Sequence, residues 1–251
     1  RRAQVGEYVR GRGEASVADL SDAFGVSADT VRRDLLKLEN LGVLTRTHGG
    51  AVAMAQPTAE LHSVTERQTR HLASKQAIGA AAARLVVDGE TVLINGGSTT
   101  LEVARALGAH PGVALVTCSP QVVLAVAEQP GRGVHLLGGR WYPEFGVVVG
   151  PVALPGTLGL RADRLVMGVA GITPAGVSIA NVEEAAMISS MIDSARRVVV
   201  VADASKFDRD AFAVLADLSR IDTLVTDRTP DGDLARALAD ADVAVVVAPR
   251  A

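Results

Sequence analysis

The sequence predicts an α/β protein in which helices cover both faces of a mostly parallel sheet, with a small winged helix-turn-helix domain at the N-terminus. Strand-like apolar runs alternate with helical segments along most of the chain, which is typical of a parallel sheet. Apolar residues make up 48% of the 251 residues and aromatic residues only 3%, so we expect a core of aliphatic strands under Ala-rich helices. Two amphipathic helices joined by a tight turn lie near the N-terminus. We place the two domains at 1–56 and 57–251.

The N-terminal domain is organised around a predicted helix over 27–41. Val31, Leu35 and Leu38 recur at spacings of four and three, so they line one face of that helix. Ser27 is a natural N-cap whose side-chain oxygen can accept the backbone N–H of Thr30. The pattern therefore predicts an amphipathic helix with a polar face left for other contacts.

A second helix precedes this one, and a hairpin follows it. Ser16 and Asp19 have the spacing of a capping box at the start of the earlier helix. The turn at 25–26 is short enough to favour a helix-turn-helix. Residues 44–53 read as two short strands joined through glycines 49 and 50, which would form a wing.

In such an arrangement the N-terminus of the later helix enters the major groove of DNA. The alternative is an ordinary pair of packed helices with a solvated basic face, and the pattern alone does not separate the two. The side chains that we expect to contact DNA are Ser27, Thr30, Arg32, Arg33, Lys37, Arg46 and His48.

The charge divides unevenly between the two domains. Residues 1–56 carry eight basic and seven acidic residues, a net charge of +1, and residues 57–251 carry 17 and 21, a net charge of −4. The sign of this difference suits a DNA-binding domain on an acidic body. Its size is small, and DNA binding depends on clustered charge more than on net charge.

After a linker near 56–58, the chain reads as a polar helix over 60–70 and an Ala-rich helix over 73–87. The alternating part follows. We predict strands over 91–95, 113–117, 134–137, 165–169, 198–202, 223–226 and 243–247, and helices over 100–107, 120–127, 181–195 and 234–239. Four consecutive valines begin the strand over 198–202, which favours a buried central position.

Ligands of such sheets bind beyond the carboxyl ends of the strands, where loops run into helices. Four of these loops carry glycines, hydroxyls or cations that could form an anion nest. Each residue also has a simpler explanation as a turn glycine, a helix cap or half of a surface ion pair. The candidates from these loops are Asn95, Gly97, Ser98, Thr99, Thr100, Cys118, Ser119, Gly139, Arg140, Asp203 and Lys206.

The N-terminal domain carries a specific resemblance. The matching residues are Arg1, Val5, Val9, Ser27, Thr30, Val31, Arg32, Arg33, Asp34 and Leu35, followed by 41–51. With these residues the domain resembles the N-terminal domain of the deoxyribose-operon repressor (DeoR) family of bacterial transcriptional regulators.

Residues 57–251 resemble the sensor domain of the same family, which is similar in fold to ribose-5-phosphate isomerase. The matching segments are 88–92, 97–100, 137–139, 150–151, 168–172, 203–207 and 221–227. The resemblance implies a phosphorylated sugar or a related metabolite as effector, and it adds Gly171 and Glu184 to the effector-binding residues.

Three positions depart from the family pattern. Asn95 stands in place of the usual aspartate, Cys118 in place of an asparagine, and Ile188 in place of a lysine. Losing a carboxylate and a cation together is consistent with a changed ligand, a weaker one or none. These positions lie outside the predicted DNA-binding domain.

The sequence favours a cytoplasmic transcriptional regulator that represses a carbohydrate operon, with no cofactor, no metal and no membrane span. One cysteine, Cys118, excludes an internal disulfide or a zinc finger. We expect a homodimer or homotetramer on double-stranded operator DNA. Two alternatives stay open: a regulator whose sensor domain serves assembly only, and a sugar-phosphate isomerase, against which the residues at 95 and 188 argue.

Overall fold

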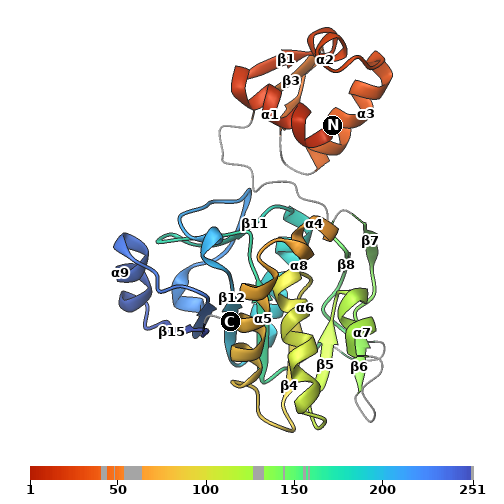
Figure 1. The fold of residues 1–251 in the computed structure, drawn as a ribbon. Helices are drawn as coiled ribbons and strands as arrows, with labels where there is room; N and C mark the ends of the chain where they lie inside the picture. The colour runs from red at the N-terminus through yellow and green to blue at the C-terminus, as the bar shows by residue number, and fades with distance from the viewer. Residues whose placement is uncertain are drawn as a thin grey trace.

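The computed structural model describes residues 1–40, 44–47, 49–53, 64–126, 133–143, 145–154, 157 and 159–249. Its elements form two groups with separate apolar clusters (Figure 1). We call the described residues up to 53 the head and those from 64 onward the body. No helix among the described residues is long and apolar enough to span a membrane.

The head contains the predicted helix-turn-helix and wing. Its elements are α1 (Arg2–Arg12), β1 (Glu14–Ser16), α2 (Val17–Phe24), α3 (Ala28–Asn40), β2 (Leu44–Arg46) and β3 (Gly50–Ala53). The capping box at Ser16 is confirmed, because its hydroxyl accepts the backbone N–H of Asp19 at 3.0 Å while the Asp19 carboxylate accepts the backbone N–H of Ser16 at 2.9 Å. Gly25 ends α2 in the left-handed region, at φ 62°.

The wing has one strand more than predicted. β1 pairs with β3 in an antiparallel three-stranded sheet of order β1-β3-β2. The sequence did not predict β1, because its three residues acquire strand geometry only by pairing with a segment some way along the chain. Under this sheet Val31, Leu35 and Leu38 of α3 are buried together with Leu20, as the spacing predicts.

The body is built on a seven-stranded sheet in which every neighbouring pair is parallel. Its order is β15-β14-β12-β9-β4-β5-β6. The strands are β4 (Thr91–Ile94), β5 (Ala114–Thr117), β6 (Val134–Leu136), β9 (Arg164–Gly168), β12 (Val198–Val201), β14 (Thr223–Thr226) and β15 (Ala244–Val247). The predicted alternation and the buried central valine strand, β12, are both confirmed.

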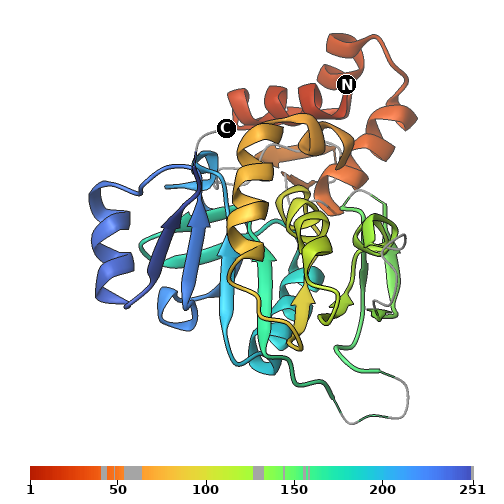
Figure 2. The ribbon, with the colours of Figure 1, turned by 60° about the horizontal axis from the view of Figure 1, so that its bottom comes forward.

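Helices cover both faces of this sheet, also as predicted. The body helices are α4 (Val64–Thr69), α5 (Leu72–Ala83), α6 (Ser98–Ala106), α7 (Pro120–Val126), α8 (Val182–Ser194) and α9 (Gly232–Asp240). Helices α5, α6 and α7 pack against alternate strand residues on one face, and α8 and α9 pack on the other. Figure 2 shows the orange and yellow helices across the front of the sheet and α9 at its blue end.

Some helices begin or end a few residues away from their predicted bounds, because local backbone hydrogen bonds set the first and last turns. Helix α5 ends at Ala83 and not at residue 87, since the N–H groups of Leu85 and Val86 turn back to the carbonyls three residues earlier. Helix α6 begins at Ser98, two residues before the predicted start, because Leu101 N–H already bonds the Gly97 carbonyl at 3.0 Å.

Short antiparallel strands beside the main sheet were not predicted. They form a hairpin and a three-stranded sheet of order β10-β11-β13. These strands are β7 (Arg140–Tyr142), β8 (Val147–Val149), β10 (Gly171–Thr173), β11 (Gly176–Ile179) and β13 (Ala213–Ala216), and the three short 3₁₀ helices of the body are η1 (Leu107–Ala109), η2 (Ala204–Lys206) and η3 (Leu218–Arg220). These strands lie outside the regular alternation of strands and helices that indicates the strands of the main sheet, so the sequence pattern did not predict them.

Candidate functional site

Helix α3 separates its residues into a buried and an exposed face. The hydroxyls of Ser27 and Thr30 lie 2.9 Å apart, and the Thr30 backbone N–H approaches the Ser27 hydroxyl at 3.4 Å. Ser27 therefore occupies the predicted cap position, and its hydroxyl orients that of Thr30. Because Ser27 is exposed and Thr30 half-buried, this hydroxyl pair stands at the end of the helix that a major groove would receive.

The two arginines of α3 are both exposed, but their surroundings differ. Arg32 Nη1 donates to the Asp29 carboxylate at 3.0 Å, and both side chains are mostly solvated. Arg33 and Lys37 lie one turn apart on the exposed face. Such a surface pair holds Arg32 only weakly, so the exposed face of α3 presents cations to an approaching polyanion.

Asp34, next to these arginines, has a structural role. Its carboxylate is buried and accepts Arg1 Nε at 2.7 Å, with Arg2 Nε at 3.8 Å. The pair ties the start of α1 to the middle of α3. The Arg-Arg-Asp run thus contributes two exposed cations and one buried anchor.

In the wing, Arg46 is exposed and contacts Glu39 of α3. Its backbone N–H donates to Glu39 Oε1 at 2.9 Å, and its guanidinium lies 3.6 Å from Glu39 Oε2. This contact sets the position of β2 against the helix. His48, also predicted to contact DNA, lies outside the described residues.

In the body, the carboxyl ends of the parallel strands meet at one edge, and the first turn of α6 opens there. Gly97 is the N-cap of α6 and supplies no side-chain acceptor. The backbone N–H groups of Ser98, Thr99 and Thr100 therefore keep the capacity to bind an anion. The Thr100 hydroxyl is buried and donates to the carbonyls of Asn95 at 3.0 Å and Gly97 at 3.1 Å, so it shapes the turn.

Asn95 uses its amide to join two strand ends. Fully buried, it donates from Nδ2 to the Gly168 carbonyl at 3.1 Å and accepts the Gly168 N–H at Oδ1 over 2.9 Å. An aspartate here would lack the donor for that carbonyl. The departure at residue 95 thus closes the end of β4 onto the end of β9.

Cys118 and Ser119 follow β5 and are both buried. The Cys118 carbonyl accepts the Val148 N–H at 2.8 Å, which joins this loop to β8. Burial, with a further contribution from Glu184, raises the pKa of the Cys118 thiol to about 12. The side chain is therefore a neutral thiol at neutral pH.

Two predicted glycines are required by close backbone contacts. A Cβ on Gly139 would come within 2.1 Å of the Val149 carbonyl oxygen, and one on Gly171 within 2.0 Å of the Arg209 carbonyl oxygen. Both positions therefore need glycine for packing. Arg140 is exposed on β7, where its guanidinium lies 5.0 Å from the centre of the Tyr142 ring.

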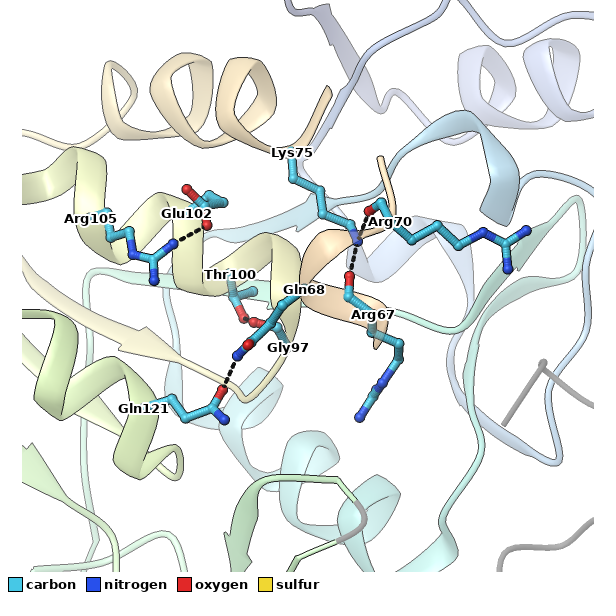
Figure 3. A network of polar contacts seen from close by, with 9 residues as sticks. All are labelled: Arg67, Gln68, Arg70, Lys75, Gly97, Thr100, Glu102, Arg105 and Gln121. Atoms are coloured by element: carbon cyan, nitrogen blue, oxygen red, sulfur yellow. Dashed lines mark hydrogen bonds and ion pairs between the residues drawn. The ribbon is translucent and has the colours of Figure 1, made fainter. Parts of the chain in front are cut away.

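Cations from α4, α5 and η2 gather around two buried carboxyl groups at this edge. Lys75 is buried, and its ammonium donates to the carbonyls of Arg67 and Arg70 at the end of α4 (Figure 3). Burial lowers the pKa of Lys75 and of Lys206, while the Asp203 carboxylate opposes the shift in both. This electrostatic coupling places α5 and the loop after β12 at a common site.

Asp203 is held ionised at the centre of this cluster. Burial opposes its ionisation, but hydrogen bonds from Ser205 and the charges of Lys206 and Lys75 leave its pKa below the usual value. The Ser205 N–H donates to Asp203 Oδ1 at 3.0 Å. A cavity of about 340 Å³ opens beside the cluster and is lined by Ala73, Ser74, Ala77, Ala204, Asp227, Arg228 and Pro249.

Glu184 is the second buried carboxyl group, in the first turn of α8. Its backbone N–H is capped by Asn181 Oδ1 at 2.8 Å. Burial raises the pKa of its carboxyl to about 7, and the nearby Arg67 guanidinium opposes this shift. Burial likewise lowers the pKa of Arg67, which the Glu184 charge opposes. Ile188, one turn later, is packed in the apolar cluster beneath.

The sequence prediction left out two cations of this site, Arg67 and Lys75. Lys75 had a detectable signal, because it lies three residues before Ile78 on the apolar face of an Ala-rich helix. A lysine at a core position is rarely buried without a specific partner. Arg67 stood in a polar segment, where its burial gave no signal. The described residues hold no cluster of His, Cys, Asp and Glu that could bind a metal.

Comparison with known proteins finds two family models that match separate parts of the chain. Residues 1–56 match the DeoR-like helix-turn-helix domain, and residues 70–228 match the DeoR C terminal sensor domain. The HTH-type transcriptional regulator GlpR of Haloferax volcanii is 34% identical over 98% of this chain and 96% of its own length. The glycerol-3-phosphate regulon repressor of Escherichia coli is 29% identical over 93% of this chain and 92% of its own length.

Among solved structures, ribose 5-phosphate isomerase A of Methanocaldococcus jannaschii matches 53% of each chain, with a TM-score of 0.36 and 17% identity. The two domain matches and the full-length relatives carry the assignment, and they agree with the predicted regulatory, non-enzymatic role. The chain belongs to the DeoR family of transcriptional regulators.

Proposed function

We propose that this regulator is a repressor that binds operator DNA through the exposed face of α3 and the wing, and that a phosphorylated sugar or related metabolite modulates it from the body. The single observation that supports an anionic effector is the gathering of Arg67, Lys75 and Lys206 around the buried carboxyl groups of Glu184 and Asp203. A dianionic phosphate can accept hydrogen bonds from the backbone N–H groups of the first turn of α6 and can also pair with these cations.

The effector proposed here combines a phosphate with hydroxyl groups. The first turn of α6 and the cations would receive the phosphate, since a helix N-terminus and ammonium groups both favour negative charge. The carboxyl groups of Glu184 and Asp203 can accept hydrogen bonds from sugar hydroxyls. Glycerol 3-phosphate and hexose phosphates have this chemistry, and one relative is named for the glycerol-3-phosphate regulon.

The experiment that tests the effector is a thermal-shift panel of sugar phosphates, glycerol 3-phosphate and inorganic phosphate on the full chain. A ligand that binds the folded protein raises the midpoint by mass action. We expect at least one phosphate ester to raise it, and the matching unphosphorylated sugar to leave it unchanged. The same compound should weaken operator binding by about 1–3 kcal/mol, the usual size of an allosteric coupling.

A second function, a regulator whose body serves assembly only, also has an observation in its favour. The polar groups of Asn95, Thr100 and Lys75 already bond within the protein, so the site gives up internal contacts on binding. A panel without any midpoint shift would favour this second function.

In either case we propose that the protein binds a symmetric operator as a two-fold dimer, since each head reads one half-site. Sedimentation of the protein with and without operator DNA tests this.

A further inference from the structure

Helix α4 is too short to be stable without its surroundings. It spans six residues, Val64–Thr69, whereas isolated helices below roughly 12 residues are marginal in water. Its conformation therefore depends on the contacts that hold it to the rest of the body. It is also the first described element after β3, the last strand of the wing.

One side-chain contact joins α4 to α7, the helix that follows α6 in the chain. Gln68 Nε2 donates to Gln121 Oε1 at 2.7 Å. Gln68 comes from α4, and Gln121 lies in the first turn of α7, directly after the loop that holds Ser119. Figure 3 shows the Gln68–Gln121 pair overlapping Gly97 and Thr100 in this view, and α4 contacts α6.

Two further contacts fix the same helix to charged groups of the site. The Lys75 ammonium donates to carbonyls at the end of α4, those of Arg67 and Arg70. The Arg67 side chain extends away from Lys75 (Figure 3), and its charge interacts with buried Glu184. An anion at the site would attract both cations, so its charge acts on the position of α4.

We propose that α4 is a lid on the anion site, fastened by the Gln68–Gln121 pair, and that effector binding stabilises its docked state. This inference rests on the proposed function and adds how binding would reach the head. When α4 is docked, it fixes the position on the body to which the head is connected through the chain. An effector that favours the docked state then favours one placement of the head, which is the differential interaction that a population shift requires.

Hydrogen exchange of the full chain tests the lid directly. The Arg70 N–H, which bonds the Glu66 carbonyl at 3.1 Å, and the α4 amides report docking. We expect glycerol 3-phosphate and inorganic phosphate, as probes, to slow exchange at α4 in the wild-type protein. Without a probe, Gln121→Met should speed this exchange several-fold, because methionine keeps the length of glutamine and loses the amide.

Operator release gives the functional readout. In Gln121→Met, the probe concentration for half-release should rise several-fold, since more ligand is needed to hold a weakened lid. Gln68→Met should match it, and the double variant should equal either single variant, because both changes remove one bond. Gln76→Met, at an exposed position of α5, is the matched control and should leave both readouts unchanged.

The outcomes separate the lid from the site. If a probe raises the thermal midpoint but α4 exchange and half-release stay as in wild type in both variants, the lid is wrong and the anion site stands. If the two single variants act additively, the amide pair is not the fastening. If no compound shifts the midpoint, the proposed effector site fails and the lid fails with it.

Discussion

The head and the body present their polar groups in opposite ways. On α3, Arg32, Arg33 and Lys37 are exposed. In the body, Asn95, Thr100 and Lys75 are buried and bonded to backbone groups. A surface that reads DNA must be solvated before contact, because phosphates and base edges replace water there. The site proposed for a small anion is instead held rigid by its own bonds. Similar residue types therefore do different work in the two regions.

The largest effect that would test this comparison is on the core of the head. Leu38 is fully buried on the inner face of α3, whereas Leu36 on the same helix is 45% exposed. Leu38→Ala should lower the free energy of unfolding of the head by about 2–5 kcal/mol and abolish operator binding. Leu36→Ala, the matched control, should change it by less than about 0.5 kcal/mol. Equal losses, measured by urea unfolding followed by circular dichroism, would mean that α3 packs differently.

The next effect concerns the buried carboxyl of Glu184, whose pKa is raised from 4.5 to about 7 in the folded protein. The folded state binds this proton more tightly than the unfolded state. Protonation of Glu184 therefore stabilises the folded state fully below the unfolded pKa, and this stabilisation is lost as pH rises through the folded pKa. Relative to Glu184→Gln, the wild type should lose about 3 kcal/mol between roughly pH 4.5 and 7. Urea titrations of both proteins across this range measure it, and parallel pH profiles would contradict the assignment.

Arg33→Ala sharpens the comparison from the exposed side. Since Arg33 is solvated in the free protein, the variant should unfold at the wild-type temperature and lose about 1–3 kcal/mol of operator affinity. Arg84→Ala, an exposed arginine of the body, is the control for net charge. A gel-shift titration compares the three proteins; wild-type affinity in Arg33→Ala would remove Arg33 from the DNA contacts.

The smallest expected effect is at Asp29. Its pair with Arg32 is a surface ion pair, which is worth roughly 0.2–1 kcal/mol. Asp29→Asn should cost no more than about 1 kcal/mol of stability, and it should tighten operator binding slightly, because one negative charge leaves the face that approaches DNA. Binding isotherms at several salt concentrations measure this; weaker binding would show that the pair positions Arg32 for contact.

Prediction from sequence succeeded where the signal was local. The capping box at Ser16 and the apolar spacing of Val31, Leu35 and Leu38 lie within a few residues of one another, and each appears as predicted. The alternation of strands and helices is likewise repeated along the chain. The DNA contacts of α3 stay a prediction, with His48 outside the described residues, and so does the domain boundary at 56.

The proposed effector site was harder to predict, because its members come from separate segments. The predicted Gly139 and Gly171 have close backbone contacts that require glycine, and Arg140 lies over Tyr142, while contact of these residues with an effector stays a prediction. Conversely, Arg67 and Lys75 were not predicted, and the structure brings them to buried carboxyl groups more than 100 residues further along the chain. A single residue at one loop end gives no indication of which distant side chain will face it.

The sequence by itself determined the alternation of main-sheet strands and helices, the helix caps at Ser16 and Ser27, the two faces of α3 and the edge of the sheet at which loops meet. Those properties follow from hydrophobic periodicity and from the rule that parallel strands end together. Only the tertiary structure decided that Asn95 bonds to Gly168 and that the lysine of α5 holds the end of α4. The physical reason is that burial and hydrogen-bond partners are properties of the packed chain, since each depends on residues that meet only after folding.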